Sequence, residues 1–172
     1  MERIRYKKNH SLGYFGADDY DPIGSVTGYK CYTSEEEDLL WVEFVDPEYT
    51  NSKGFEKRVC QLILTQTKRG VYEVDMMIID KEFQGLGLAP RFYAYLLRKL
   101  NITLKAGSCQ SPGGRSIWTR LGKRVDVLVY GKTPSGRPTM MIEQGGEMQP
   151  INGRHEAYDG DRTFEMYAVR AA

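Results

Sequence analysis

The sequence predicts one mixed α/β domain, in which helices flank a single central mixed β-sheet, and three observations predict it. Several segments are rich in β-branched and aromatic residues, and their polarity alternates as in strands. One longer segment repeats apolar residues at three- and four-residue steps, as an amphipathic helix does. Strands precede the helices and follow them, which differs from the strict alternation of a doubly wound parallel fold. We therefore expect one domain over residues 1–172.

The first half of the chain predicts strands. Ser25–Thr33 gives a weak strand signal, and Leu39–Val45 and Arg58–Thr67 give stronger ones. Val71–Asp80 begins with alternating polarity and ends in an unbroken apolar run, which is typical of a strand buried on both faces. A turn signal at residues 68–70 indicates that the last two strands form a hairpin. No amphipathic helix is predicted before Ala89, so the N-terminal region is expected to be atypical.

The second half predicts two helices among further strands. An apolar face defines the first helix, and Pro90 suits its first turn because a missing N–H costs nothing there. The residues of that face are Ala89, Phe92, Tyr93, Leu96, Leu97 and Leu100. The other expected elements are a strand at Ile102–Ala106, a helix at Gly113–Leu121, and strands at Arg124–Gly131, Thr139–Glu143 and Thr163–Arg170.

Composition limits the classes of partner and of compartment. The formal net charge is +1, which gives no general attraction to nucleic acid or to an anionic membrane, so such a partner would need a local patch. No apolar run approaches the ~20 residues that cross a bilayer. The three cysteines form no C-x-x-C pair, and the chain starts without a secretory signal. We therefore expect a cytoplasmic protein that contacts neither nucleic acid nor membrane and has no metal ligands.

The most informative segment is the glycine-containing stretch between the apolar strand and the amphipathic helix. Glycine at positions 85 and 87 lets the backbone approach a ligand closely and turn its N–H groups towards one point. The helix that follows adds its positive N-terminal end. Together these features predict an anion site suited to the pyrophosphate of a nucleotide cofactor.

Two common phosphate-binding patterns do not fit. A P-loop would need a glycine five residues before Gly131, but Asp126 stands there. A dinucleotide fingerprint would need a glycine or alanine at the third position, which is Pro90. An acidic residue at the end of a second strand, about 20 residues further on, is also missing.

The pattern Gln84-x-x-Gly87-x-Ala89 resembles motif A of the GNAT superfamily of acyl-coenzyme A-dependent N-acyltransferases. The preceding strand resembles the family's fourth strand, whose backbone pairs with the pantetheine arm, and the following helix resembles the long helix behind the loop. The resemblance implies that acetyl-coenzyme A is the acyl donor. The cofactor-binding residues that it implies are Met77, Ile78, Ile79, Gln84, Gly85, Leu86, Gly87, Leu88 and Ala89.

A second segment, Ile117–Gly122, resembles the family's motif B, with two departures. Trp118 stands where many members carry a tyrosine that protonates the leaving thiolate, and Ser111 stands where many carry an asparagine. An indole N–H can donate a hydrogen bond but is no proton source near neutral pH. A packing role for Trp118 is therefore as good an interpretation as a catalytic one, and Ser111 could instead start a helix.

The resemblance implies direct attack of a neutral amine on the thioester. The best candidates for the general base are Glu73 and Asp75, which share one face of the strand that leads into the loop. The alternative is that both simply face solvent. The expected partner is an amine acceptor, either a small molecule or a protein, and homodimer formation is left open.

Two other functions remain open at this point. A GNAT-fold protein could bind acyl-coenzyme A or a protein partner without turnover, and both Trp118 and the unusual N-terminal half agree with that interpretation. A nucleotide-binding protein of another fold is the third interpretation, against which the missing third glycine argues.

Overall fold

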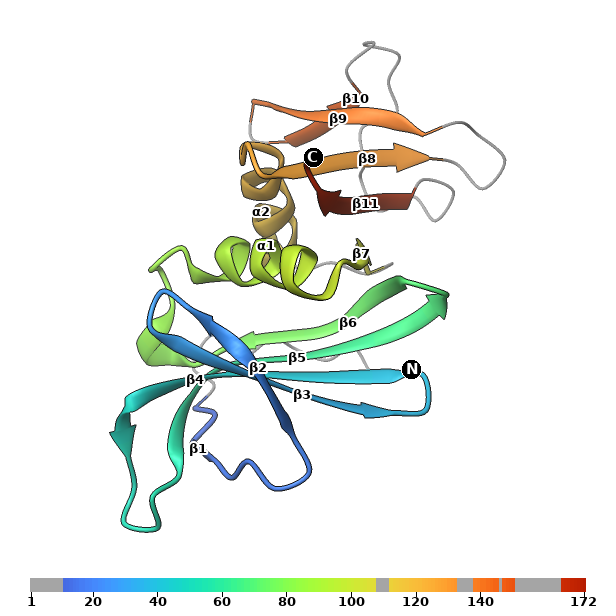
Figure 1. Ribbon diagram of the computed structural model, residues 1–172. Coiled ribbons are helices and arrows are strands. Elements are labelled where there is room, and N and C mark those ends of the chain that lie inside the picture. Colours follow the sequence, from blue (N-terminus) through green and yellow to red (C-terminus); the bar gives the residue numbers. More distant parts are fainter. Residues whose placement is uncertain (1–10, 108–111, 133–137, 146, 151–164) are drawn as a thin grey trace. The chain divides into compact units, whose positions relative to one another are not determined.

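The computed structural model describes residues 11–107, 112–132, 138–145, 147–150 and 165–172, and it shows a mixed α/β protein made mostly of strands (Figure 1). The chain forms two compact units. The first comprises Met1–Thr65 with Asp75–Leu88, and the second comprises Gln66–Val74 with Ala89–Ala172. The long strands β5 and β6 each contribute residues to both units.

The first unit is an antiparallel meander with one added strand. In it, β2, β3, β4 and β5 pair in chain order, β6 neighbours β5, and β1 also pairs with β5. The bounds are β1 Tyr14–Phe15, β2 Asp21–Val26, β3 Tyr29–Glu36, β4 Leu39–Thr50, β5 Glu56–Lys68 and β6 Val71–Ile79. Its core contains Val42, Phe44, Leu62 and Leu64, which are fully buried. These residues alternate along β4 and β5, as the sequence pattern predicts.

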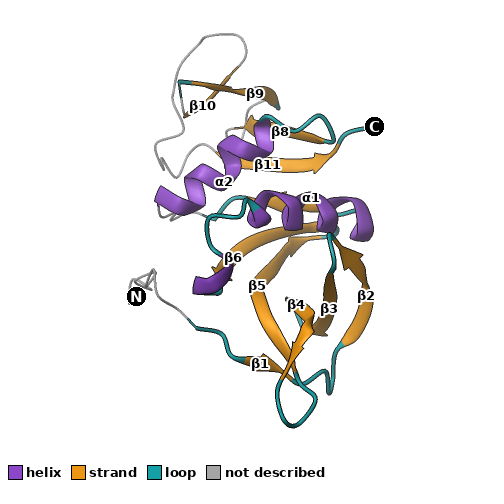
Figure 2. Ribbon diagram, turned by 90° about the vertical axis from the view of Figure 1, so that its left-hand side faces the viewer, coloured by secondary structure: helices purple, strands orange, loops and turns teal. Residues whose placement is uncertain are grey.

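The second unit carries both helices. Its strands follow the order β10-β9-β8-β11-β7-β6, in which β6 and β7 are parallel and the other pairs are antiparallel. The bounds are α1 Leu88–Leu100, β7 Thr103–Lys105, α2 Pro112–Gly122, β8 Val127–Lys132, β9 Thr139–Gln144, β10 Glu147–Pro150 and β11 Glu165–Arg170. Helix α1 is the crossover between the parallel strands β6 and β7, and α2 contacts β8, β9 and β10 (Figure 2).

Four of the six residues of the apolar face predicted for α1, Phe92, Tyr93, Leu96 and Leu97, are buried, whereas Ala89 and Leu100 are half-buried. Ala94 and Tyr95 are buried as well, so the middle of α1 is covered on more sides than one apolar face predicts. Most other predicted elements are present with shifts of one or two residues at their ends, but β4 continues to Thr50, five residues beyond the predicted Val45. The predicted strand Ser25–Thr33 is wrong as one element, since Thr27 and Gly28 adopt positive φ and form the turn between β2 and β3.

Three other strands also differ from the prediction. Strand β8 begins at Val127 rather than Arg124, because Arg124 and Asp126 form an ion pair in the preceding turn. The short strands β1 and β10 were not predicted at all. Each has few residues and depends on a partner strand, β5 for β1 and β9 for β10.

A β-bulge in β5 places a buried charge pair in the first unit. Glu43 is fully buried on β4, where Gln61 lies opposite it. The register shifts after Phe44, so Arg58 rather than Val59 pairs with Val45. The extra residue turns Arg58 to the face that carries Glu43.

The two charged groups meet imperfectly. The Gln61 amide donates to Oε1 of Glu43 at 2.9 Å. Nε of Arg58 lies 3.5 Å from Oε2 of Glu43, but neither atom completes a hydrogen bond. Burial raises the pKa of Glu43 to about 7, although Arg58 and Gln61 oppose the shift.

The raised pKa predicts a pH-dependent loss of stability that Glu43→Gln should remove. The folded-state pKa of Glu43 exceeds its unfolded value, so the neutral form of Glu43 favours the folded state. This stabilisation is complete below the unfolded pKa and is lost as pH rises to about 7. We expect the free energy of unfolding of Glu43→Gln, relative to the wild type, to increase by about 3 kcal/mol between acidic and mildly alkaline pH. Chemical denaturation across this range, with the exposed Glu35→Gln as control, measures the difference. Parallel stability curves for wild type and Glu43→Gln would contradict it.

Candidate functional site

The candidate site is the turn that joins β6 to α1 in the first unit. Strand β6 ends at Ile79, the short 3₁₀ helix η1 covers Lys81–Phe83, and α1 starts at Leu88. The stretch between η1 and α1 holds Gly85 and Gly87, so the structure places the predicted glycine-containing segment between a strand and a helix, as expected from the sequence.

Asp80 fixes the start of this turn. Its side chain is fully buried and accepts two backbone hydrogen bonds, from Glu82 N at 3.0 Å through Oδ1 and from Leu12 N at 2.8 Å through Oδ2. Its own N–H donates to the carbonyl of Val59 at 2.8 Å, and its carbonyl accepts from Phe83 N at 2.9 Å. One residue therefore ties the turn to β5, to the N-terminal segment and to η1.

Gln84 braces the other end of the turn. Its side-chain amide donates to the carbonyl oxygen of Ile79 at 3.1 Å, which satisfies the last carbonyl of β6. This hydrogen bond closes a short loop between the end of the strand and the residue before the glycines. The sequence predicts Gln84 as a cofactor-binding residue, and the structure gives its side chain a supporting contact within the protein.

The two glycines adopt backbone conformations that other residues rarely take. Gly85 has φ +77° and Gly87 has φ +68°, and a Cβ built on either would meet no atom within 4 Å. Leu86 lies between them with 57% of its surface exposed. The turn therefore presents its backbone to open space, which a side chain at either glycine would partly fill.

The electrostatics at the start of α1 favour an anion. The first turn of the 13-residue helix contains no acidic residue, and Arg91 in that turn is exposed. The first N–H groups of a helix have no partner within it, and with the helix dipole they add partial positive charge at this end. Leu88 and Pro90 are buried and hold the first turn in place.

The end of β6 lies beyond its ladder with β7. Among the described residues, the parallel register pairs Val71, Tyr72 and Glu73 with Thr103–Lys105. Met77 is buried, whereas the side chains of Ile78 and Ile79 are half-buried. The predicted pantetheine-pairing residues are thus located on a part of the strand outside the parallel ladder.

The two predicted base candidates have different surroundings. Glu73 is half-buried, and its carboxylate lies 3.8 Å from Nζ of Lys105, which is also 3.0 Å from the carboxylate of Glu165. Asp75 is exposed and accepts a hydrogen bond from the Thr65 hydroxyl. Glu73 is therefore engaged by a counter-ion, whereas Asp75 is open to solvent.

Trp118 packs in the interior of the second unit. Only 2% of its surface is exposed, and its ring meets the ring of Tyr93 edge to face, with centroids 6.3 Å apart. This environment favours the packing interpretation of the residue. Ser111 lies outside the described residues.

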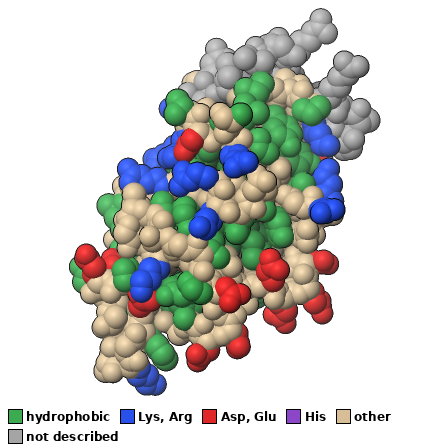
Figure 3. All heavy atoms as spheres, in the orientation of Figure 1, with side chains coloured by type: hydrophobic (Ala, Val, Ile, Leu, Met, Phe, Trp, Pro, Cys, Tyr) green, Lys and Arg blue, Asp and Glu red, His purple; other side chains and the backbone are tan. Residues whose placement is uncertain are grey.

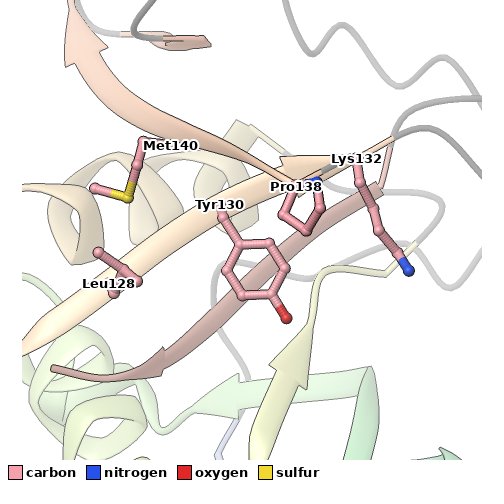
Figure 4. Close-up of a pocket in the computed structure, with 5 residues that line it drawn as sticks. All are labelled: Leu128, Tyr130, Lys132, Pro138 and Met140. Atoms are coloured by element: carbon pink, nitrogen blue, oxygen red, sulfur yellow. The ribbon is translucent and has the colours of Figure 1, made fainter. Parts of the chain in front are cut away.

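A pocket in the second unit was not predicted from the sequence. It has a volume of about 330 Å³ and is lined by Leu128, Tyr130, Lys132, Pro138 and Met140 (Figure 4). The Tyr130 ring stacks on Tyr167 with centroids 5.2 Å apart. Leu128, Tyr130 and Lys132 alternate along β8 and therefore share one face of the strand. The sequence shows this alternation, but alternation alone does not distinguish an exposed sheet face from a covered one. None of the predicted site residues lines this pocket.

No protein-family model, no curated protein and no solved structure matches the chain. Within the described ranges, no group of three or more His, Cys, Asp or Glu residues could hold a metal ion. In the same part of the chain, neither helix is long and apolar enough to span a membrane.

Replacing Asp80 by asparagine should destabilise the protein by about 1–3 kcal/mol. Leu12 and Glu82 donate to different oxygens of Asp80, so one of these backbone N–H groups would face the NH₂ group of the asparagine instead of an acceptor. The exposed neighbour Glu82→Gln serves as control. Urea denaturation measures both variants, and equal stabilities of Asp80→Asn and wild type would show that the carboxylate is not the anchor.

Proposed function

We propose that this protein binds acetyl-coenzyme A and transfers its acetyl group to an amine, as GNAT-type N-acyltransferases do. The observation that carries the proposal is the turn at Gly85 and Gly87, whose two positive-φ residues border open space directly before the start of α1. A turn whose backbone borders open space and a helix N-terminus without carboxylates suit a pyrophosphate.

The order of elements around the turn supports the same function. A strand, the turn, a long helix, a parallel strand and a second helix follow one another as β6, α1, β7 and α2. This is the order that the resemblance to motifs A and B implies. The described residues before α1 form strands and the short η1 and contain no α-helix. The acceptor side is therefore atypical, and the acceptor is proposed only as an amine.

In the proposed complex, the backbone around Gly85, Gly87 and Ala89 would hold the diphosphate, and Met77–Ile79 would pair with the pantetheine arm. Acetyl-coenzyme A supplies the acyl group already activated as a thioester. The amine nitrogen forms a bond to the carbonyl carbon while the carbon–sulfur bond breaks. Backbone N–H groups on β6 are suited to stabilise the oxyanion.

Two proton transfers accompany this exchange. Asp75 is the more accessible candidate to take the proton from the ammonium, directly or through water, because Glu73 is engaged by Lys105. The leaving thiolate takes a proton from solvent in this scheme, since Trp118 is buried and its indole is no acid at neutral pH.

A second candidate function is a binding protein for acyl-coenzyme A without turnover. The burial of Trp118 favours it, because the position that often supplies the acid in the family packs here against Tyr93. Incubation with acetyl-coenzyme A and a panel of amines, with detection of free thiol, separates the two functions. A binding protein would show affinity for the cofactor without release of thiol.

Gly87→Val should strongly lower the affinity for coenzyme A. The side chain would enter the open space beside the turn and force a β-branched residue to positive φ. Gly28→Val is the matched control, because Gly28 also has positive φ and open space but lies in the turn between β2 and β3. Calorimetric titration of both folded variants with coenzyme A measures the effect. Unchanged affinity of Gly87→Val would exclude this turn as the phosphate site.

Trp118→Phe should lower the free energy of unfolding by about 1–3 kcal/mol and leave turnover within about threefold of the wild type. The smaller ring keeps the apolar contact with Tyr93 but leaves a cavity. Steady-state rates and thermal unfolding of the same variant give both values. A large fall in turnover with normal cofactor affinity would assign the indole N–H a part in the reaction.

A further inference from the structure

The basic residues are concentrated in one part of the chain. Between Glu82 and Asp126 there is no acidic residue, although eight of the 24 Lys and Arg residues lie there. They are Arg91, Arg98, Lys99, Lys105, Arg115, Arg120, Lys123 and Arg124. The rest of the chain therefore carries a net charge of −7, and the net charge of +1 hides a strong separation of charge.

Six of these side chains are exposed on or just after the two helices of the second unit, and they define the basic helical surface. They are Arg91, Arg98 and Lys99 of α1, Arg115 and Arg120 of α2, and Lys123 after it. Figure 3 shows Lys and Arg side chains gathered over this part of the molecule. The other two basic residues of this stretch are less exposed and form ion pairs, Lys105 with Glu73 and Glu165 and Arg124 with Asp126.

The charge of Arg98 on α1 reaches the segment that follows α2. A hydrogen bond from Arg124 lowers the pKa of Asp126, and the charge of Arg98 on α1 contributes to the same shift. Arg91 and Arg98 are seven residues apart, so they project from the same side of α1, about 10 Å apart along its axis. Two cations therefore project from one side of α1, and Figure 3 shows Lys and Arg side chains gathered over the same part of the molecule.

The chemistry around these cations selects the kind of anion. The exposed large hydrophobic residues of the described chain include none from α1 or α2, whose apolar faces are buried. A protein partner usually needs apolar or aromatic anchors, and a membrane-surface helix needs apolar residues to insert. Single-stranded nucleic acid is held largely by stacking on exposed aromatic rings, which these helices lack.

We propose that the basic helical surface binds the phosphate backbone of double-stranded nucleic acid without sequence preference. Arginine supplies four of its six cations and forms bidentate hydrogen bonds with phosphate. A polar, strongly basic surface is typical of such interfaces. The net charge of the whole chain predicts no nucleic-acid partner, and the local separation of charge reverses that expectation. The inference does not depend on acyl transfer.

Fluorescence anisotropy with a labelled duplex of about 20 base pairs tests the proposal. About four phosphate contacts predict that the dissociation constant rises roughly 100-fold between about 50 and about 200 mM salt. The double variant Arg98→Glu with Arg120→Glu should weaken binding at least about 10-fold at low salt. The control, Lys53→Glu with Lys68→Glu, changes the net charge equally at exposed positions outside the two helices and should retain binding.

Three results would overturn the proposal. The first is that the wild type does not bind the duplex at low salt. The second is an equal loss of duplex affinity in both double variants, which would indicate attraction to net charge alone. The third is that the double variant Arg98→Glu with Arg120→Glu still binds the duplex but loses its affinity for coenzyme A. That result would assign the surface to the cofactor. If that variant fails to fold, Arg98→Gln with Arg120→Gln removes the same two charges without reversing them.

Discussion

The hydrogen bonds of the buried Asp80 carboxylate join the end of β6 to the N-terminal segment and to η1. A carboxylate out of water is stable only when its oxygens are well supplied with donors, and here two backbone N–H groups supply them. One donor belongs to the N-terminal segment and the other to η1, so a single side chain holds together parts of the chain 68 residues apart. The turn that holds the two glycines starts from this anchored residue.

The brace at Gln84 completes the same arrangement from the other side. Its hydrogen bond to the Ile79 carbonyl fixes the distance between the end of β6 and the first glycine. Gly85 and Gly87 follow with positive φ values beside open space, a conformation that glycine adopts without steric cost. A rigid support and a bare backbone are what a site for a bulky anion requires.

Charge is distributed in a way that the composition does not reveal. The pair of Glu43 and Arg58 leaves polar atoms without a complete hydrogen bond inside the first unit. The helices of the second unit expose cations, and the sequence has no acidic residue between Glu82 and Asp126. The first arrangement affects stability as a function of pH, and the second favours association with anions. Both are compatible with a net charge of +1, which is why that value says little about partners.

The sequence by itself determined the elements whose signal is local. Periodicity located the α1 helix to within a residue of its start, and alternation located β6 to within one residue of its end. The spacing of Gly85 and Gly87 between them was also readable, because the strand, turn and helix are contiguous. What the sequence could not provide were pairings over long distances along the chain. The partners of Asp80, the bulge that turns Arg58 towards Glu43, and the packing of Trp118 on Tyr93 all join separate segments, and only the tertiary structure brings such segments together.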